Sequence, residues 1–315
     1  MNEWAEDRKK LVVGTRGSQL AIWQAEWVRG QLKALAPEID ITLQRIHTSG
    51  DKILDVPLAK IGGKGLFVKE IEEALLRGEI DLAVHSMKDV PSVLPDKLEI
   101  VCVPQREDPR DVLVSGEGLP LEKLRPGAKI GTSSLRRQAQ LLSYRSDFQI
   151  HMLRGNLDTR LRKVRQGAYD AIVLAAAGLG RMGWTQEITE YLSSEISLPA
   201  IGQGALGLEG RRADRFVKEL VAKLEHGPTR IRVNAERAFL ARLEGGCQVP
   251  IAGHAVIEHN EVTLEGLIAS VDGQRYVREK ISGSLDEAER IGVELAERLL
   301  AAGGRSILQE IYGTS

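Results

Sequence analysis

The stretch Lys129-Ile-Gly-Thr-Ser-Ser-Leu-Arg-Arg-Gln-Ala-Gln-Leu-Leu-Ser-Tyr144 decides the fold, because it holds a strand, a turn and a helix in one short run. Lys129–Gly131 is typical of a short buried strand. Thr132–Ser134 then places hydroxyl groups where the free N–H groups of a helix N-terminus need acceptors. The apolar spacing predicts the helix itself over Leu135–Tyr144. A strand that leads through a polar turn into a helix predicts an α/β domain.

The same alternation continues on both sides of this stretch. It predicts strands at 11–14, 39–43, 81–85, 99–103, 148–153 and 170–175, and helices at 19–35, 66–77, 156–166 and 211–225. Such alternation favours mostly parallel sheets with helices on both faces. Pro104–Arg110 and the glycine-rich Leu198–Gly204 are predicted crossings between two domains.

After Gly227-Pro228 the pattern changes. A helix is followed by three alternating strands, at 254–257, 262–268 and 276–281, and by a second helix at 285–302. We therefore predict two α/β domains and a small C-terminal α+β domain with an antiparallel sheet. The expected boundaries are residues 1–104 with 200–224, residues 105–199, and residues 225–315.

Composition narrows the class of protein. The 315 residues are 43% hydrophobic and 28% charged with a net charge of -1, which gives no overall bias toward nucleic acid or membrane surfaces. Two cysteines do not make a disulfide framework. Residues 1–10 lack the apolar core of a signal peptide, and no apolar run is long enough to span a bilayer. We expect a cytoplasmic protein.

Polar side chains gather where the predicted strands end, which is where ligands of open α/β sheets bind. Residues 125–165 also carry ten basic and only two acidic side chains. Loops are polar by default, so any one of these groups alone fits an ordinary surface loop. Several arginines together favour an anion site, because a guanidinium binds carboxylate or phosphate through paired N–H groups. The groups are Arg16 with Ser18, Lys88 with Asp89, Thr132 to Ser134, and Arg154 with Asn156.

Single residues leave alternatives open. Asp89 is either a carboxylate that serves a ligand or reaction, or a turn aspartate before Pro91, and its spacing favours neither. Lys64 lies in a glycine-rich loop that lacks the spacing of a nucleotide-binding motif. Cys247, behind two glycines, is either an accessible reactive thiol or a small core residue, which is the commoner case. No grouping has the spacing of metal ligands, so we expect no metal site.

Seven motifs spread over nearly the whole chain resemble those of the porphobilinogen deaminase, or hydroxymethylbilane synthase, family. They are Gly14–Gln24, Gly62–Phe67, His85–Pro91, Gly131–Gln138, Arg154–Asn156, Leu198–Gly204 and Glu244–Gln248. The resemblance implies that the first two domains are arranged like a type II periplasmic binding protein. It also implies that Cys247 carries a dipyrromethane cofactor through a thioether. Four porphobilinogen molecules are then added in turn, each losing ammonia, and hydroxymethylbilane is released by a monomeric enzyme.

The resemblance also implies roles for individual residues. Each pyrrole carries an acetate and a propionate, which calls for many arginines, and loss of ammonia leaves a cationic azafulvene that Asp89 would face. Catalysis falls to Asp89, Lys88 and Arg16, and substrate binding to Arg16, Ser18, Arg154, Arg181 and Gln203. Cofactor binding falls to Cys247, Asp89, Lys88, Ser86, Thr132, Ser134, Arg136, Arg137 and Arg160, and Lys64 and Phe67 belong to a loop that acts as a lid.

Two other classes of function remain as alternatives. A non-catalytic binding protein for a small polycarboxylate would suit the first two domains, but it has no use for a thiol next to glycines. Nucleic-acid binding through the arginine-rich domain is disfavoured by the near-neutral charge and the 4% aromatic content.

Overall fold

The computed structural model describes residues 8–52, 65, 67–244 and 249–313, within which the chain forms two units. Unit 1 holds the described residues of 1–53, 63–106 and 205–230, and unit 2 holds those of 107–204 and 231–315. The changes of unit after residues 106 and 204 fall in the two segments predicted as crossings. Each unit is described by itself below, and the division into three domains stays a prediction.

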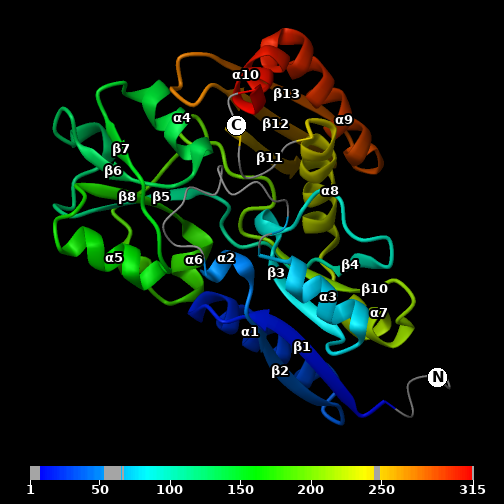
Figure 1. Ribbon diagram of the computed structural model, residues 1–315. Coiled ribbons are helices and arrows are strands. Elements are labelled where there is room, and N and C mark those ends of the chain that lie inside the picture. The colour runs from blue at the N-terminus through cyan, green and yellow to red at the C-terminus, as the bar shows by residue number, and fades with distance from the viewer. Residues whose placement is uncertain (1–7, 53–64, 66, 245–248, 314–315) are drawn as a thin grey trace. The chain divides into compact units, whose positions relative to one another are not determined.

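Unit 1 is a five-stranded sheet in the order β2-β1-β3-β10-β4 (Figure 1). β1 runs parallel to β2 and β3, whereas β10 is antiparallel to both of its neighbours. Helices α1 and α7 pack on one face of the sheet, and α3 packs on the other. The strands are β1 (Lys10–Arg16), β2 (Asp40–Ile46), β3 (Leu82–Ser86), β4 (Leu98–Cys102) and β10 (Leu206–Arg211), and the helices are α1 (Gln19–Leu35), α2 (Ser49–Lys52), α3 (Lys69–Arg77) and α7 (Arg215–Ala222).

Local sequence explains where these helices begin and end. Ser18 caps α1, whose Ala25, Val28 and Leu32 recur at the helical period and are fully buried. α3 ends at Gly78, whose positive φ of 72° is the left-handed conformation that glycine adopts without a steric cost. The capping hydroxyl and the terminal glycine therefore fix both helices from their own sequence.

Unit 2 contains a second five-stranded sheet, in the order β7-β6-β8-β5-β9. β6 is parallel to β7 and β8, and β5 is antiparallel to β8 and β9. α4 packs on one face of this sheet, and α5 and α6 pack on the other. The strands are β5 (Asp111–Ser115), β6 (Lys129–Gly131), β7 (Gln149–His151), β8 (Ala171–Ala175) and β9 (Glu190–Tyr191), and the helices are α4 (Leu135–Tyr144), α5 (Leu157–Arg165) and α6 (Ala176–Arg181).

The rest of unit 2 is an antiparallel sheet of β11, β12 and β13, and α8 and α9 lie beside it in Figure 1. Phe239 of α8 is fully buried on this sheet, where Gly266 leaves room for its ring, since a Cβ at Gly266 would lie 2.7 Å from the ring. The elements are α8 (Gly227–Arg242, which begins in unit 1), β11 (Ile251–Glu258), β12 (Glu261–Ala269), β13 (Tyr276–Ser284), α9 (Ala288–Leu299), a π-helical turn (Leu300–Gly304) and α10 (Arg305–Gly313).

The turn between β12 and β13 packs against α4, the helix at the centre of the stretch quoted first. Gly273 of this turn has a φ of 71°, and a Cβ there would lie 2.2 Å from the carbonyl oxygen of Ala139. Gln138 Nε2 also donates to the carbonyl of Val271 at 3.3 Å. The two sheets of unit 2 are therefore joined through α4.

The predicted fold class is confirmed, with two α/β sheets and a small antiparallel α+β part. The expectation of mostly parallel sheets is wrong in detail, because the two strands that directly follow the crossings, β5 and β10, were not predicted and are antiparallel to their neighbours. The helix predicted over 211–225 is present as α7 but is shorter, because β10 extends to Arg211 and α7 begins at Arg215 and ends at Ala222. The helix predicted over 285–302 ends at Leu299, and the one predicted from 66 begins at Lys69.

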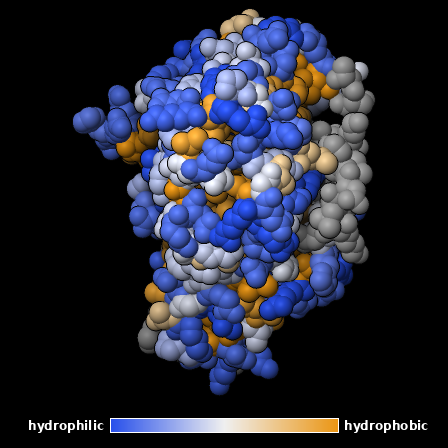
Figure 2. Space-filling model, turned by 90° about the vertical axis from the view of Figure 1, so that its left-hand side faces the viewer, coloured by the Kyte–Doolittle hydropathy of each residue, from blue (hydrophilic) through white to orange (hydrophobic). Residues whose placement is uncertain are grey.

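The surface agrees with the composition. Hydrophilic residues cover most of the face shown in Figure 2, and hydrophobic ones lie between them in small patches. None of the helices in the described part of the chain has the length and apolar character needed to cross a membrane.

Candidate active site

Unit 1 presents its candidate residues at the carboxyl ends of the parallel strands β1 and β3. β1 ends at Arg16, and the Oγ of Ser18 accepts a hydrogen bond from the backbone N–H of Ala21 at 3.2 Å. The guanidinium of Arg16 lies over the ring of Phe67, with 4.1 Å between Cζ and the ring centroid. The predicted lid residue Phe67 therefore contacts a predicted substrate-binding residue. Lys64 lies outside the described residues.

β3 continues directly into a short 3-10 turn, η2 (Met87–Asp89). Ser86, just before it, accepts a hydrogen bond at its Oγ from Gln24 Nε2 at 3.1 Å. Lys88 and Asp89 are half-buried, and the Asp89 carboxylate forms no hydrogen bond or ion pair with any residue that the structure describes. Such a carboxylate can accept N–H groups of a ligand or stabilise a positive charge that develops on it.

In unit 2 the predicted hydroxyl groups lie where β6 leads into α4. Thr132 is buried, and its Oγ1 accepts the backbone N–H of Ser134 at 3.2 Å. Ser134 caps α4 by accepting the N–H of Arg137 at 3.4 Å, while Ser133 donates to the carbonyl of Leu153 at 2.7 Å. These hydroxyls therefore order the turn before α4, whose N-terminus favours anions.

Arg136 and Arg137 converge on a carboxylate that the sequence analysis did not single out. Asp111 at the start of β5 is fully buried and accepts hydrogen bonds from Arg136 Nη1 at 2.8 Å and from Arg137 Nη2 at 2.7 Å. Ser197 Oγ donates to the same carboxylate at 2.7 Å. Burial alone would raise the pKa of Asp111, but the two guanidiniums outweigh it and hold that pKa well below its usual range. Ligand binding by the two arginines stays a prediction.

Gln203, a predicted substrate-binding residue, also belongs to this buried network. Its side chain is buried, and its Nε2 donates to the carbonyl of Pro109 at 2.7 Å and to Asp111 Oδ1 at 2.9 Å. The amide therefore ties the two crossing segments together within unit 2. A role toward substrate stays a prediction for Gln203 as well.

The remaining predicted arginines keep positive charge close to low-dielectric surroundings. Arg181 in α6 is buried and donates to the carbonyl of Gly204 at 2.7 Å, and it forms no ion pair with a carboxylate in the described part of the chain. Burial lowers the pKa of Arg181 to about 10. Burial also lowers the pKa of Arg154, and Arg160 Nε donates to the carbonyl of Gly155 at 2.8 Å. A buried guanidinium of this kind gains stability from an anionic ligand.

The two cysteines differ in what the structure describes. Cys102 at the end of β4 is a buried free thiol, and burial raises its pKa, so it is an inert core residue. Cys247, the predicted cofactor anchor, lies outside the described residues. The described residues contain no group of three or more His, Cys, Asp and Glu side chains that could hold a metal ion.

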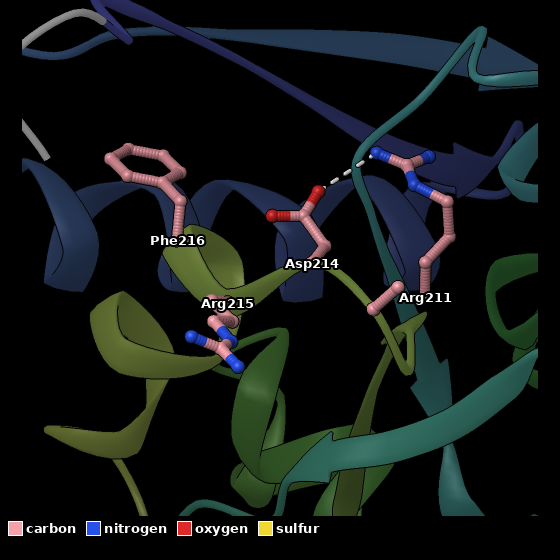
Figure 3. A pocket seen from close by; sticks show the side chains of 5 residues that line it. Arg211, Asp214, Arg215 and Phe216 are labelled. Atoms are coloured by element: carbon pink, nitrogen blue, oxygen red, sulfur yellow. Dashed lines mark hydrogen bonds and ion pairs between the residues drawn. The ribbon is translucent and has the colours of Figure 1, made fainter. Parts of the chain in front are cut away.

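A surface pocket of about 530 Å³ lies where β10 leads into α7 (Figure 3). Its lining includes Arg211, Asp214, Arg215 and Phe216, and the Arg211 Nη2 to Asp214 Oδ2 distance is 3.0 Å. None of these residues is a predicted site residue. The charges of Arg211 and Asp214 are satisfied by each other and by Arg8 and Asp81, so this pocket has a structural explanation.

The described residues fit the two-pyrrole group that the family resemblance implies. That group carries carboxylates, for which the half-buried Arg160 of α5 offers a guanidinium. It also carries pyrrole N–H donors, for which Asp89 offers an acceptor. Both properties belong to side chains that the sequence analysis assigned to the site.

Solved structures with a similar chain path include two from bacterial proteins. The VFT2 domain of BvgS from Bordetella pertussis has a TM-score of 0.43 and 15% sequence identity, with 70% of this chain and 89% of that chain covered. The periplasmic aliphatic sulphonate binding protein SsuA from Escherichia coli has a TM-score of 0.41 and 14% identity, with 76% of this chain and 71% of that chain covered.

Comparisons with known sequences give much higher identities. Residues 11–219 match the family model described as porphobilinogen deaminase, dipyromethane cofactor binding domain, and residues 230–301 match that of the porphobilinogen deaminase C-terminal domain. The porphobilinogen deaminase of Pelobacter propionicus is 57% identical over 304 residues, which covers 96% of this chain and 98% of that protein. The porphobilinogen deaminase of Geobacter sulfurreducens is 57% identical over 303 residues, covering 96% and 95%. The chain belongs to the porphobilinogen deaminase family.

Proposed function

We infer that this chain is a transferase, hydroxymethylbilane synthase, which joins four molecules of porphobilinogen into the linear tetrapyrrole hydroxymethylbilane. The observation that carries this conclusion is the 57% identity to porphobilinogen deaminases over 96% of the chain. Each addition forms a carbon–carbon bond between a free pyrrole carbon and the aminomethyl carbon of the substrate. The amino group takes up a proton, the carbon–nitrogen bond breaks and ammonia leaves. The pyrrole carbon that formed the new bond then gives up its own proton. Water supplies the hydroxyl group of the released product.

We assign to Asp89 the role of stabilising the positive charge that develops during this reaction. Its half-buried carboxylate accepts pyrrole N–H groups and stabilises the cation that forms on the substrate when ammonia leaves. Opposite charges at close range near a protein surface attract by about 4 kcal/mol, compared with about 1 kcal/mol in bulk water. Lys88 and Arg16, at the ends of the neighbouring strands β3 and β1, hold carboxylates of the reacting molecules.

The remaining site residues bind the acidic side chains of cofactor and substrate. Dipyrromethane, when bound through a thioether to Cys247, supplies the pyrrole carbon to which the first substrate is joined. Thr132 and Ser134 at the start of α4, with Ser86 in unit 1, offer hydroxyl groups. Arg181 offers a desolvated guanidinium. The same assignment covers the other residues named for these roles: Ser18, Arg136, Arg137, Arg154, Arg160 and Gln203, with Lys64 and Phe67 in a lid.

We also propose that the enzyme acts as a monomer in the cytoplasm, with porphobilinogen as its substrate and without a nucleic-acid partner. The free, buried thiol of Cys102 and the net charge of -1 support this setting.

Intact mass spectrometry of the purified chain tests the proposal, with Cys247→Ser as the variant and Cys102→Ala as the matched control. We expect added mass equal to two linked pyrrole units in the parent and in Cys102→Ala, and none in Cys247→Ser. Asp89→Ala should keep its circular dichroism spectrum while ammonia release falls at least roughly 100-fold.

An unmodified parent mass that persists after incubation with porphobilinogen would contradict the enzymatic assignment and favour a binding protein. Near-normal ammonia release by Asp89→Ala would remove Asp89 from its assigned role.

A further inference from the structure

Unit 1 buries a histidine and a glutamate side by side, and the proposed reaction uses neither. His85 Nε2 on β3 lies 2.8 Å from Glu209 Oε2 on β10, and the two side chains are 3% and 0% exposed. In the antiparallel register of β3 and β10, Gly207 is opposite His85 and Ala83 is opposite Glu209. The two side chains therefore form a diagonal pair on the same face of the sheet.

α3 covers that face and adds a third titratable group. Burial, and then the charge of Glu209, raise the pKa of Glu72 to about 7, although His85 opposes this shift. Glu72 Oε1 and Glu209 Oε1 have no hydrogen-bond partner among the described residues. From β1, Arg16 falls on the same face at the same end of the sheet, two residues beyond the pairing of Gly14 with Ala83. Of the groups on this face named here, the imidazole of His85 is the one that lies within hydrogen-bonding distance of the Glu209 carboxylate.

The pair lies immediately before the turn that carries Asp89. β3 ends one residue after His85, and η2 follows at once. The backbone N–H of Met87 donates to the carbonyl of Ala205 at 3.0 Å, and a Cβ at Gly207 would lie 2.7 Å from Met87 Cε. The segment from Ala205 into β10 therefore holds the chain just before the turn, through His85, and at the first residue of the turn, through Met87.

We propose that the His85–Glu209 pair is a positioning device that fixes the turn bearing Asp89 against β10. The proposal rests on the function assigned to Asp89 above. Burying such a pair contributes little net stability, because the cost of desolvation offsets the attraction between the two groups. We therefore assign the pair an effect on the position of the turn and not on the stability of the fold. Direction matters at this place, since a displacement of about 1 Å in a reacting group can reduce a rate roughly 100-fold.

The test separates positioning from stability by removing both partners. His85→Phe combined with Glu209→Leu leaves no buried charge unpaired, so the double variant should melt close to the parent. We expect its kcat to fall roughly 10- to 100-fold while KM stays within about twofold. His85→Gln, which keeps an N–H donor for Glu209, should recover most of the lost kcat.

Asp81→Asn is the matched control. Asp81 lies at the opposite end of β3, where it accepts the backbone N–H of Val12 at 2.9 Å and pairs with Arg211 of β10 at 3.0 Å. Its loss should lower the melting temperature and leave kcat unchanged. Every variant is assayed as holoenzyme, with cofactor loading checked by intact mass.

A folded, loaded double variant that turns over like the parent would overturn the proposal, as would a His85→Gln variant no faster than the double variant. A loaded parent that releases no ammonia would instead refute the proposed function. The two failures are therefore distinguishable.

Discussion

A carboxylate with no exposed surface survives in Asp111 because donors surround it completely. Five hydrogen bonds reach it, from Arg136, Arg137 twice, Ser197 and Gln203. The sequence shows the adjacent arginines and predicts anion binding, but it does not show that an internal anion already pairs with them. Their partner lies 25 and 26 residues away, and Gln203 lies 92 residues away, so only the folded chain reveals the network.

Ionisation of Glu72 makes the stability of the fold depend on pH. Its pKa is raised from 4.5 to about 7, so the native state holds this proton more tightly than the unfolded chain does. The stability from the neutral acid is complete below pH 4.5 and is lost as the pH rises through about 7. Glu72→Gln removes this loss, and we expect its melting temperature to gain on the parent steadily from pH 5 to pH 8.

Glu70→Gln on the same helix is the control of opposite sign. Although burial opposes the shift, hydrogen bonds from Ser49 hold the pKa of Glu70 below its usual value. Its ionised form therefore stabilises the fold fully above pH 4.5, and this stabilisation is lost as the pH falls below 4.5, so the variant should melt below the parent by a constant amount from pH 5 to pH 8 and approach it only at lower pH. Parallel curves for Glu72→Gln and the parent would show that Glu72 titrates normally.

At the scale of elements, the sequence predicted the strands β1, β3, β6 and β8, which lead into the candidate site or its helices, and missed β5 and β10, which follow the crossings, and the two-residue β9. β5 carries Asp111 at its head and β10 contains Gly207 and Gly210, which weaken the apolar pattern from which a strand is predicted. Both strands are stabilised by partners far along the chain, β8 for β5 and β3 for β10. The candidate residues at the ends of β1 and β3 could be predicted because these strands carry apolar runs of their own, and those after β6 because Thr132–Ser134 are typical of a helix N-terminus.

The contact of the β12–β13 turn with α4 makes a prediction at this scale. Gly273→Ala places a Cβ 2.2 Å from the Ala139 carbonyl at a positive φ of 71°, so the turn must move off the helix. Gly167→Ala is the matched control, because its φ of 73° is the same strain with nothing within 4 Å. In chemical denaturation, we expect the free energy of unfolding to fall by about 1 kcal/mol in Gly167→Ala and by roughly 1–3 kcal/mol more in Gly273→Ala. Equal losses would mean that the turn does not bear on α4.

At the scale of the whole molecule, the two units have separate hydrophobic clusters, and a defect in one should be confined to it. Asp111→Asn leaves Arg136 and Arg137 buried without their carboxylate, which should cost roughly 3–5 kcal/mol. We expect amide hydrogen exchange to quicken in β5, β6 and β8 of unit 2 while β1 and β3 of unit 1 stay protected.

Asp147→Asn is the control for this exchange experiment. Asp147 pairs with Arg145 in the same unit, but it lies at the surface, so its loss should change exchange little. Quickened exchange in both units of Asp111→Asn would instead mean that the molecule opens as one cooperative body.

The place of β10 in the unit 1 sheet affects how the nascent chain folds during synthesis. Among the strands that the structure describes, β4 pairs only with β10, and the last residue of β10, Arg211, is made about 110 residues after Cys102 ends β4. At a synthesis rate of about 5–20 residues per second, the nascent chain holds β4 for roughly 5 to 20 seconds before its partner emerges. During that interval an apolar strand edge is exposed while unit 2 is being made, and it is then that a growing chain of this protein most needs a chaperone.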